Sequence, residues 1–169
     1  MKVVFAEKPS VGRDIARCIG KGRKCDGWIE GEGWAVTWAF GHLVQLQNPE
    51  GYDVALKRWS LASLPIVPDA FLLEPRKGNG VSEQLEKVVD LFMRADEIIC
   101  ATDAGREGEL IFRYVLSWAG CEDKPMRRLW LSSMTDDAIK LGFKEMKDGH
   151  AYDNLHIAAR CRSEADWIV

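Results

Sequence analysis

Three short apolar runs, each followed by a helical pattern, constrain the fold of this chain more than any other feature of its sequence. The runs lie at residues 2–6, 97–101 and 127–131. Short apolar runs of this kind form buried strands, and strand–helix alternation produces right-handed βαβ units. The helical patterns lie at residues 10–19, from residue 82, from residue 106 and at 135–146. We therefore predict an α/β fold with a mostly parallel central sheet flanked by helices.

Residues 27–80 interrupt this alternation. Glycines punctuate residues 27–46, and the alternating run at 34–38 favours antiparallel strands and turns. Residues 47–80 are rich in proline, which predicts irregular structure with one short strand near 71–73. We expect a small antiparallel insertion at about 27–80 within a domain that spans residues 1–148.

A last helical pattern runs from residue 152 to residue 169 and ends on apolar residues without a cap. This ending suggests that the chain was cut from a longer protein. Residues 149–169 are accordingly expected to begin a following helical domain that is truncated here.

Composition narrows the class of protein. With 169 residues, of which 47% are hydrophobic and 29% charged, the chain is about one domain with a substantial core. The net charge of −3 argues against a wholly basic nucleic-acid coat protein, though not against a local DNA-binding face. No apolar run approaches the roughly 20 residues of a membrane span. Five scattered cysteines without a C-x-x-C pair favour reduced thiols. We expect a cytoplasmic chain with no membrane partner.

Acidic residues follow two of the predicted strands. Glu7 ends the first run, and the run at 97–101 leads to Asp103 and Glu107. Ligands of open parallel sheets bind beyond the carboxyl ends of the strands, where these acids would converge if the strands are neighbours. Grouped carboxylates repel unless a cation bridges them, and oxygen donors suit Mg²⁺ or Mn²⁺. Acids that merely cap or precede helices are the alternative.

The N-terminal segment carries the opposite charge. Residues 1–24 hold seven basic side chains against two acidic ones, a local charge of +5. Lys8 adjoins Glu7 and is able to hold a phosphate as a point charge. Phosphate beside a divalent cation is typical of phosphoryl-transfer chemistry, whereas a solvated helix face is the alternative interpretation.

Four segments resemble one family. Residues 6–10 (AEKPS) and 101–109 (ATDAGREGE) resemble the toprim domain of type IA DNA topoisomerases. Residues 36–43 (VTWAFGHL) resemble its bacterial topoisomerase III branch, and residues 159–167 resemble the helix that enters the next domain. The resemblance implies a Rossmann-like toprim fold and dependence on Mg²⁺, for which Mn²⁺ can substitute. It also implies transient cleavage of DNA, mainly single-stranded, by an isomerase whose remaining domains lie in the same polypeptide.

The resemblance also implies roles for individual residues. Glu7 would be a metal-proximal glutamate and the acid/base at the leaving 3′ oxygen, and Lys8 would contact the scissile phosphate. Asp103 and Glu107 would be the first and last acids of the D-x-D-x-E signature and, with Glu7, the metal ligands. The side chains implied to lie near bound DNA are Lys8, Arg106, Arg162 and Asp166.

Two departures limit what the resemblance implies. The middle acid of the signature is Gly105 here, so we expect one ion, held by Glu7 and Asp103 with Glu107 nearby. The family attacks DNA with a tyrosine from a domain downstream, and Tyr52, Tyr114 and Tyr152 lie in no matching motif. The chain would therefore form a metal-binding half-site that is inactive alone.

Two other classes remain open. A toprim-type primase or nuclease would share the acids, and a non-catalytic nucleic-acid-binding module would use them only as helix caps. The Trp- and Gly-rich residues 27–46 and the terminal helix favour the topoisomerase. A nucleotide-binding fold is disfavoured, because neither G-x-x-x-x-G-K-[ST] nor a G-x-G-x-x-G after a strand occurs.

Overall fold

A seven-stranded sheet forms the centre of the molecule, in the order β2-β3-β4-β1-β7-β8-β9. The computed structural model describes residues 1–58 and 60–169. The strands are β1 (Lys2–Ala6), β2 (Arg23–Lys24), β3 (Trp28–Gly31), β4 (Trp34–Trp38), β7 (Glu97–Ala101), β8 (Met126–Arg128) and β9 (Lys147–Asp148). The four central strands β4, β1, β7 and β8 run parallel, and the outer strands are antiparallel. The predicted α/β fold with a mostly parallel centre is confirmed.

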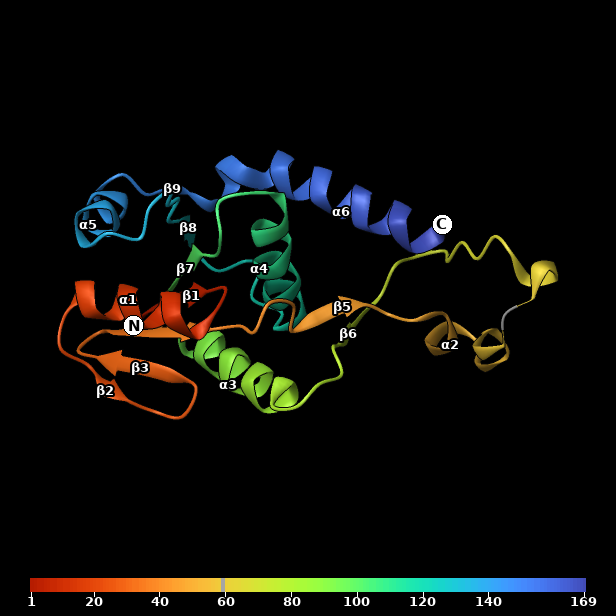
Figure 1. The fold of residues 1–169 in the computed structure, drawn as a ribbon, viewed down its shortest axis with the longest axis horizontal. Coiled ribbons are helices and arrows are strands. Elements are labelled where there is room, and N and C mark those ends of the chain that lie inside the picture. The colour runs from red at the N-terminus through yellow and green to blue at the C-terminus, as the bar shows by residue number, and fades with distance from the viewer. Residues whose placement is uncertain (59) are drawn as a thin grey trace.

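Helices cover both faces of this sheet. They are α1 (Pro9–Ile19), α3 (Val81–Arg94), α4 (Arg106–Trp118), α5 (Asp136–Lys144) and α6 (Asp153–Ile168). Val3 and Phe5 of β1 belong to a core cluster with α3 and α4, whereas Val4 and Ala6 belong to a second cluster with α1 and α5. Because both faces are covered, β1 and β7 are apolar throughout their central positions. Figure 1 shows α6 lying along the top of the molecule, against α4.

Local sequence explains where the helices begin. Pro9 occupies the first turn of α1, where its missing N–H costs nothing. The hydroxyl of Thr135 accepts a hydrogen bond from the Ala138 N–H at 3.3 Å, so the predicted cap of α5 is confirmed. The predicted strand at 127–131 is shorter than expected, since β8 ends at Arg128, although the Leu129 N–H still donates to the Cys100 carbonyl at 2.8 Å.

The interrupted region is divided between two sheets. β4 pairs antiparallel with β3, as expected, but it also pairs parallel with β1 and so belongs to the central sheet. The physical reason is that Ala35 and Val36 enter the two different core clusters, which requires cover on both faces. The separate antiparallel sheet consists of β5 (Val44–Leu46) and β6 (Leu73–Pro75). The strand expected near 71–73 thus begins at its last residue.

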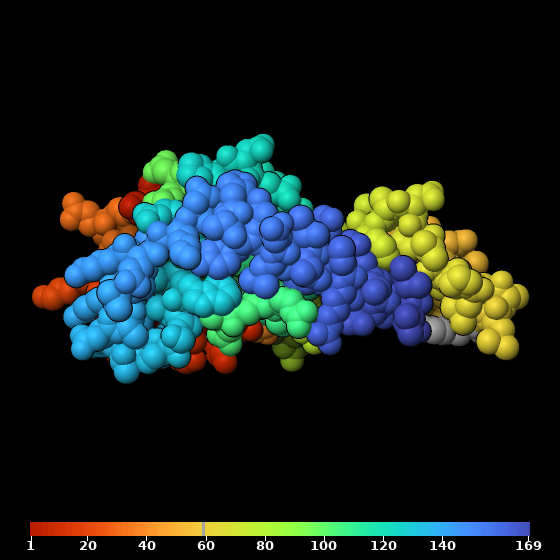
Figure 2. Space-filling model, turned by 90° about the horizontal axis from the view of Figure 1, so that it is seen from above, coloured from red at the N-terminus to blue at the C-terminus, as the bar shows by residue number. Residues whose placement is uncertain are grey.

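Residues 47–58 and 60–72, which we call the arm, extend away from the sheet (Figures 1 and 2). They contain the helical turns α2 (Pro49–Tyr52), η1 (Val54–Lys57) and η2 (Leu61–Ser63). Trp167 of α6 anchors the base of the arm, because its indole N–H donates to the Gln47 carbonyl at 3.0 Å and its ring contacts Phe71 edge-on. Farther out, Leu61 is 91% exposed.

Among the helices of the described residues, none is both long enough and apolar enough to cross a bilayer.

Candidate metal and nucleic-acid site

The topology creates a crevice at the carboxyl ends of β1 and β7. The chain leaves β1 toward β4 on one side, through α1, and leaves β7 toward β8 on the other side, through α4. Ligands of open α/β sheets bind at such a switch point. Ala6 lies opposite Ala101 in the parallel register, so the residues that follow these two strands emerge side by side.

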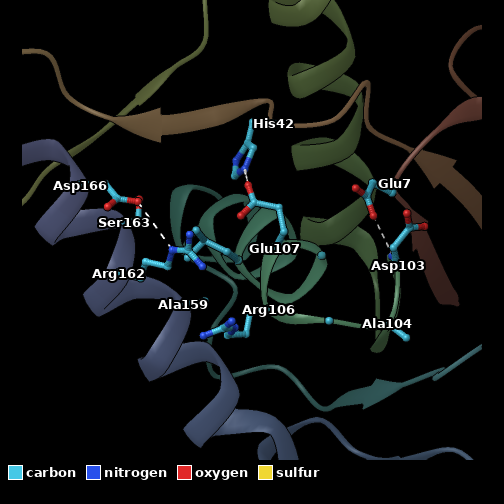
Figure 3. Close-up of a pocket in the computed structure, with 13 residues that line it drawn as sticks. Glu7, His42, Asp103, Ala104, Arg106, Glu107, Ala159, Arg162, Ser163 and Asp166 are labelled. Atoms are coloured by element: carbon cyan, nitrogen blue, oxygen red, sulfur yellow. Dashed lines mark hydrogen bonds and ion pairs between the residues drawn. The ribbon is translucent and has the colours of Figure 1, made fainter.

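Glu7 and Asp103 meet at this switch point. The Asp103 N–H donates a hydrogen bond of 2.8 Å to Glu7 Oε2 (Figure 3). Burial raises the pKa of Glu7 above its ordinary value and the charge of Asp103 raises it further, although the Asp103 N–H and Lys8 act against this shift. Two carboxyl groups are therefore held together where a cation would lower the energy of their ionised forms.

A buried arginine fixes the backbone of residues 102–108, which we call the acidic turn. Arg128 is only 1% exposed and donates to the carbonyls of Thr102 and Asp103 at 2.8 and 2.9 Å. The Thr102 hydroxyl donates to the Gly108 carbonyl at 2.7 Å. A Cβ atom on Gly108 would lie 2.1 Å from the Asp103 carbonyl oxygen, so this turn requires glycine there.

Further buried charges connect the acidic turn to α6. Arg128 Nε lies 3.3 Å from Glu109 Oε2, and the Arg113 Nε–H donates to Glu109 Oε1 at 2.9 Å. Arg113 also donates to Asp153, at the start of α6, at 2.8 Å. Glu109 is 1% exposed, so it balances two guanidinium groups within the protein. Sequence reasoning assigned Glu109 only to the helix dipole and overlooked Arg128, whose signal is an arginine inside an apolar run.

Glu107 occupies a different part of the site. Its carboxylate contacts Nε2 of His42, which lies in the loop between β4 and β5 (Figure 3). Within residues 1–58 and 60–169, no group of three or more His, Cys, Asp or Glu side chains is arranged to hold a metal ion. The three predicted ligands therefore share one pocket but form two units, Glu7 with Asp103 and Glu107 with His42.

The pocket has a volume of about 620 Å³ and lies between the acidic turn and α6. Three of the predicted DNA contacts, Arg106, Arg162 and Asp166, line it together with Ser163, which sequence reasoning missed. Arg162 Nε and Asp166 Oδ2 are 3.8 Å apart (Figure 3). Lys8 is not among the lining residues; it is an exposed residue that precedes α1. The pocket thus combines carboxylates at one end with exposed guanidinium groups at the other.

A mostly parallel sheet with Glu7 and Asp103 at its switch point, together with the order of the sequence motifs, defines a class of proteins. The family model of the Toprim domain matches residues 2–134, and the chain belongs to this family. The resemblance of residues 6–10 and 101–109 to a toprim domain is thereby confirmed. Toprim domains of topoisomerases bind metal ions.

The relatives sharpen this assignment. The chain is 51% identical over 169 residues to DNA topoisomerase 3 of Bacillus cereus (strain ATCC 10987 / NRS 248) and 48% identical to DNA topoisomerase 3 of Bacillus subtilis (strain 168). Each alignment covers 99% of this chain and 23% of the relative, so the chain spans about a quarter of their length. Full-length topoisomerase I from Thermotoga maritima shares the fold, with a TM-score of 0.64 and 20% identity over 99% of this chain and 24% of that chain.

Proposed function

We propose that this chain is the metal-binding catalytic half-site of a type IA DNA topoisomerase, an isomerase that transiently cleaves and reseals single-stranded DNA. The observation that carries the proposal is the Glu7–Asp103 pair at the switch point of a Toprim domain. The relatives named DNA topoisomerase 3 support the reaction class. The cytoplasm, where bacterial DNA lies, is the proposed location.

The attacking tyrosine would come from the part of the relatives that this chain does not span. Tyr114 is 5% exposed, and Tyr152 stacks on Trp130 with ring centroids 5.2 Å apart. None of the described residues that line the pocket is a tyrosine. The remaining domains of the same polypeptide are therefore proposed partners, both for this chain and for the reaction.

Glu7 is the proposed acid/base. A carboxyl group whose pKa is raised retains its proton closer to neutral pH, and so can donate it to a leaving 3′ oxygen and later recover it. The neighbouring Lys8 is exposed and lowers the pKa of Glu7 through its positive charge, and we propose that it contacts the scissile phosphate. These two residues constitute the proposed catalytic pair of this half-site.

Glu7 and Asp103 fit a divalent cation. Both supply oxygen donors, and the electrostatic cost that raises the pKa of Glu7 falls when a positive charge lies between them. Mg²⁺, or Mn²⁺ in its place, would offset negative charge on the phosphate there. We propose a single ion with Glu107 nearby, because Gly105 stands where the signature has its middle acid.

The arginine end of the pocket is the proposed DNA contact. Arg106 and Arg162 are exposed, and a guanidinium group can pair with a phosphate through two N–H donors. Asp166 Oδ2 lies 3.8 Å from Arg162 Nε, and both side chains line the pocket. In this proposal the arginine end of the pocket binds a single DNA strand, one phosphate of which lies beside Glu7 and Asp103.

The test is Mn²⁺ binding measured by electron paramagnetic resonance on the 169-residue chain. We expect Asp103→Asn to abolish measurable binding without lowering the metal-free melting temperature, because Asp103 is exposed. Asp123→Asn, at another exposed position, is the matched control and should bind like the parent chain. Full binding by Asp103→Asn would show that the acidic turn is not the metal site.

A further inference from the structure

The contact between Glu107 and His42 separates the third carboxylate of the pocket from the other two. Glu107 lies in the first turn of α4, and its side chain is 71% exposed. Its carboxylate contacts the imidazole of His42 rather than approaching Glu7 and Asp103 (Figure 3). An exposed glutamate on a helix has several rotamers available, so this contact determines which of them is populated.

His42 is the fixed partner in this contact. Its side chain is 23% exposed, and its ring centroid lies 6.4 Å from that of the buried Tyr114. The loop that carries it is bound to the end of β1, because the Ala39 N–H donates to the Ala6 carbonyl at 2.9 Å and the Gly41 N–H donates to the Glu7 carbonyl at 3.2 Å. The backbone of Glu7 thus positions the imidazole that restrains Glu107.

We infer that His42 is a positioning residue that keeps Glu107 away from the Glu7–Asp103 pair and thereby weakens the binding of a divalent cation. The inference rests on the proposed function, since it concerns the same metal site. A cation held by Glu7 and Asp103 attracts the carboxylate of Glu107, but Glu107 joins them only after it leaves His42. His42 therefore decides whether the pocket offers two carboxylates or three.

The test is a double-mutant cycle on the dissociation constant of Mn²⁺, with the 169-residue chain. His42→Ala should tighten binding by roughly three- to ten-fold, the size of one lost hydrogen bond. Glu107→Gln in the parent chain should change the constant by less than about two-fold. In the His42→Ala background, Glu107→Gln should remove the whole gain, because the gain comes from Glu107 alone.

His42→Gln separates positioning from a structural role of the side chain. Its amide can donate to Glu107 as the imidazole does, so it should restore the Mn²⁺ affinity of the parent chain. The ¹⁵N signals of the His42 imidazole give a second readout, which should stay close to their metal-free positions when Mg²⁺ is added to the parent chain, because Glu107 remains in contact with His42.

The outcomes distinguish the two proposals. A parent chain that binds no Mn²⁺ contradicts the metal site itself. If Asp103→Asn abolishes binding but His42→Ala leaves the constant unchanged or weakens it, the metal site stands and the role of His42 is wrong. Tighter binding by His42→Ala that persists with Glu107→Gln also contradicts the role of His42.

Discussion

The acidic turn and the arm are both connections between elements of the fold, yet they are held in opposite ways. The acidic turn is fixed by a buried guanidinium group, a buried hydroxyl and a glycine that leaves no space for a side chain. The arm is anchored at its base by Trp167, while Val54 and Leu61 are 79% and 91% exposed. Residues 102–108 therefore move only if buried charges are disturbed. The arm, by contrast, can move away from the sheet at a small cost in free energy.

This difference shows where precision is required. In the proposed metal site Asp103 must stay beside Glu7 for the pair to bind one ion. Arg128, which is linked through Glu109 to Arg113, holds the backbone of Asp103 in place. A positional error of about 1 Å in such a site is costly for catalysis. None of the arm residues that the structure describes lines the pocket, so the geometry of the arm is free of that constraint.

The largest expected effect comes from removing the support of the acidic turn. Arg128→Met leaves Glu109 buried with one of its two guanidinium partners gone, which should lower the free energy of unfolding by about 3–5 kcal/mol. Urea denaturation measures this loss. Glu109→Gln in the same background should recover part of it, because no uncompensated charge then remains.

The control for Arg128 is Arg94→Met. Arg94 pairs with Asp90 on the surface of α3 at 2.8 Å, and exposed pairs of this kind are worth about 0.5 kcal/mol. A loss for Arg128→Met no larger than for Arg94→Met would show that the buried network does not hold the turn.

A smaller effect is expected from Glu7, whose raised pKa has a definite sign. A carboxyl group with a raised pKa contributes stability below its ordinary value of 4.5, and this contribution is lost as the pH rises through the folded pKa. Glu7→Gln should therefore raise the metal-free melting temperature at pH 7 by a small amount, because solvent screening reduces the effect of a partly exposed group. At pH 3.5 the two proteins should melt together. A lower melting temperature for Glu7→Gln at pH 7 would reverse the assigned sign.

The smallest effect is expected in the arm. Leu61→Ser replaces a leucine that is 91% exposed and should change the free energy of unfolding by less than about 0.5 kcal/mol. Leu91→Ala, at a position that is 1% exposed, should cost about 2–5 kcal/mol by contrast. Similar costs for the two leucines in urea denaturation would remove the distinction between arm and core.

Sequence patterns were sufficient for the parts of the fold that depend on local periodicity. The apolar runs at β1 and β7 predicted buried strands, and Thr135 predicted the start of α5. The pairing partner of a strand depends on tertiary contacts. The parallel pairing of β4 with β1 was therefore not predicted from the alternating residues of β4. The boundaries of β6 and β8 were displaced for the same reason.

The residues of the candidate site likewise fall into a part that local sequence predicts and a part that depends on tertiary contacts. Glu7 and Asp103 are predictable as neighbours because strand ends in register must meet. The contact of Glu107 with His42 depends on a loop 65 residues away, and the burial of Arg128 depends on the packing of three elements. No local pattern encodes these distances, so the sequence placed Glu107 near Glu7 and Asp103 without indicating its contact with His42.

The register between β1 and β7 makes the spacing of Glu7 and Asp103 independent of the 95 residues that separate them in the chain. Hydrogen bonds between two adjacent strands set that spacing, so insertions or deletions in the arm leave it unchanged. Lengthening the arm would therefore change which surfaces the arm can contact, without changing the arrangement of Glu7 and Asp103 at the edge of the sheet. Families built on this plan can diversify by loop growth while their chemistry stays constant.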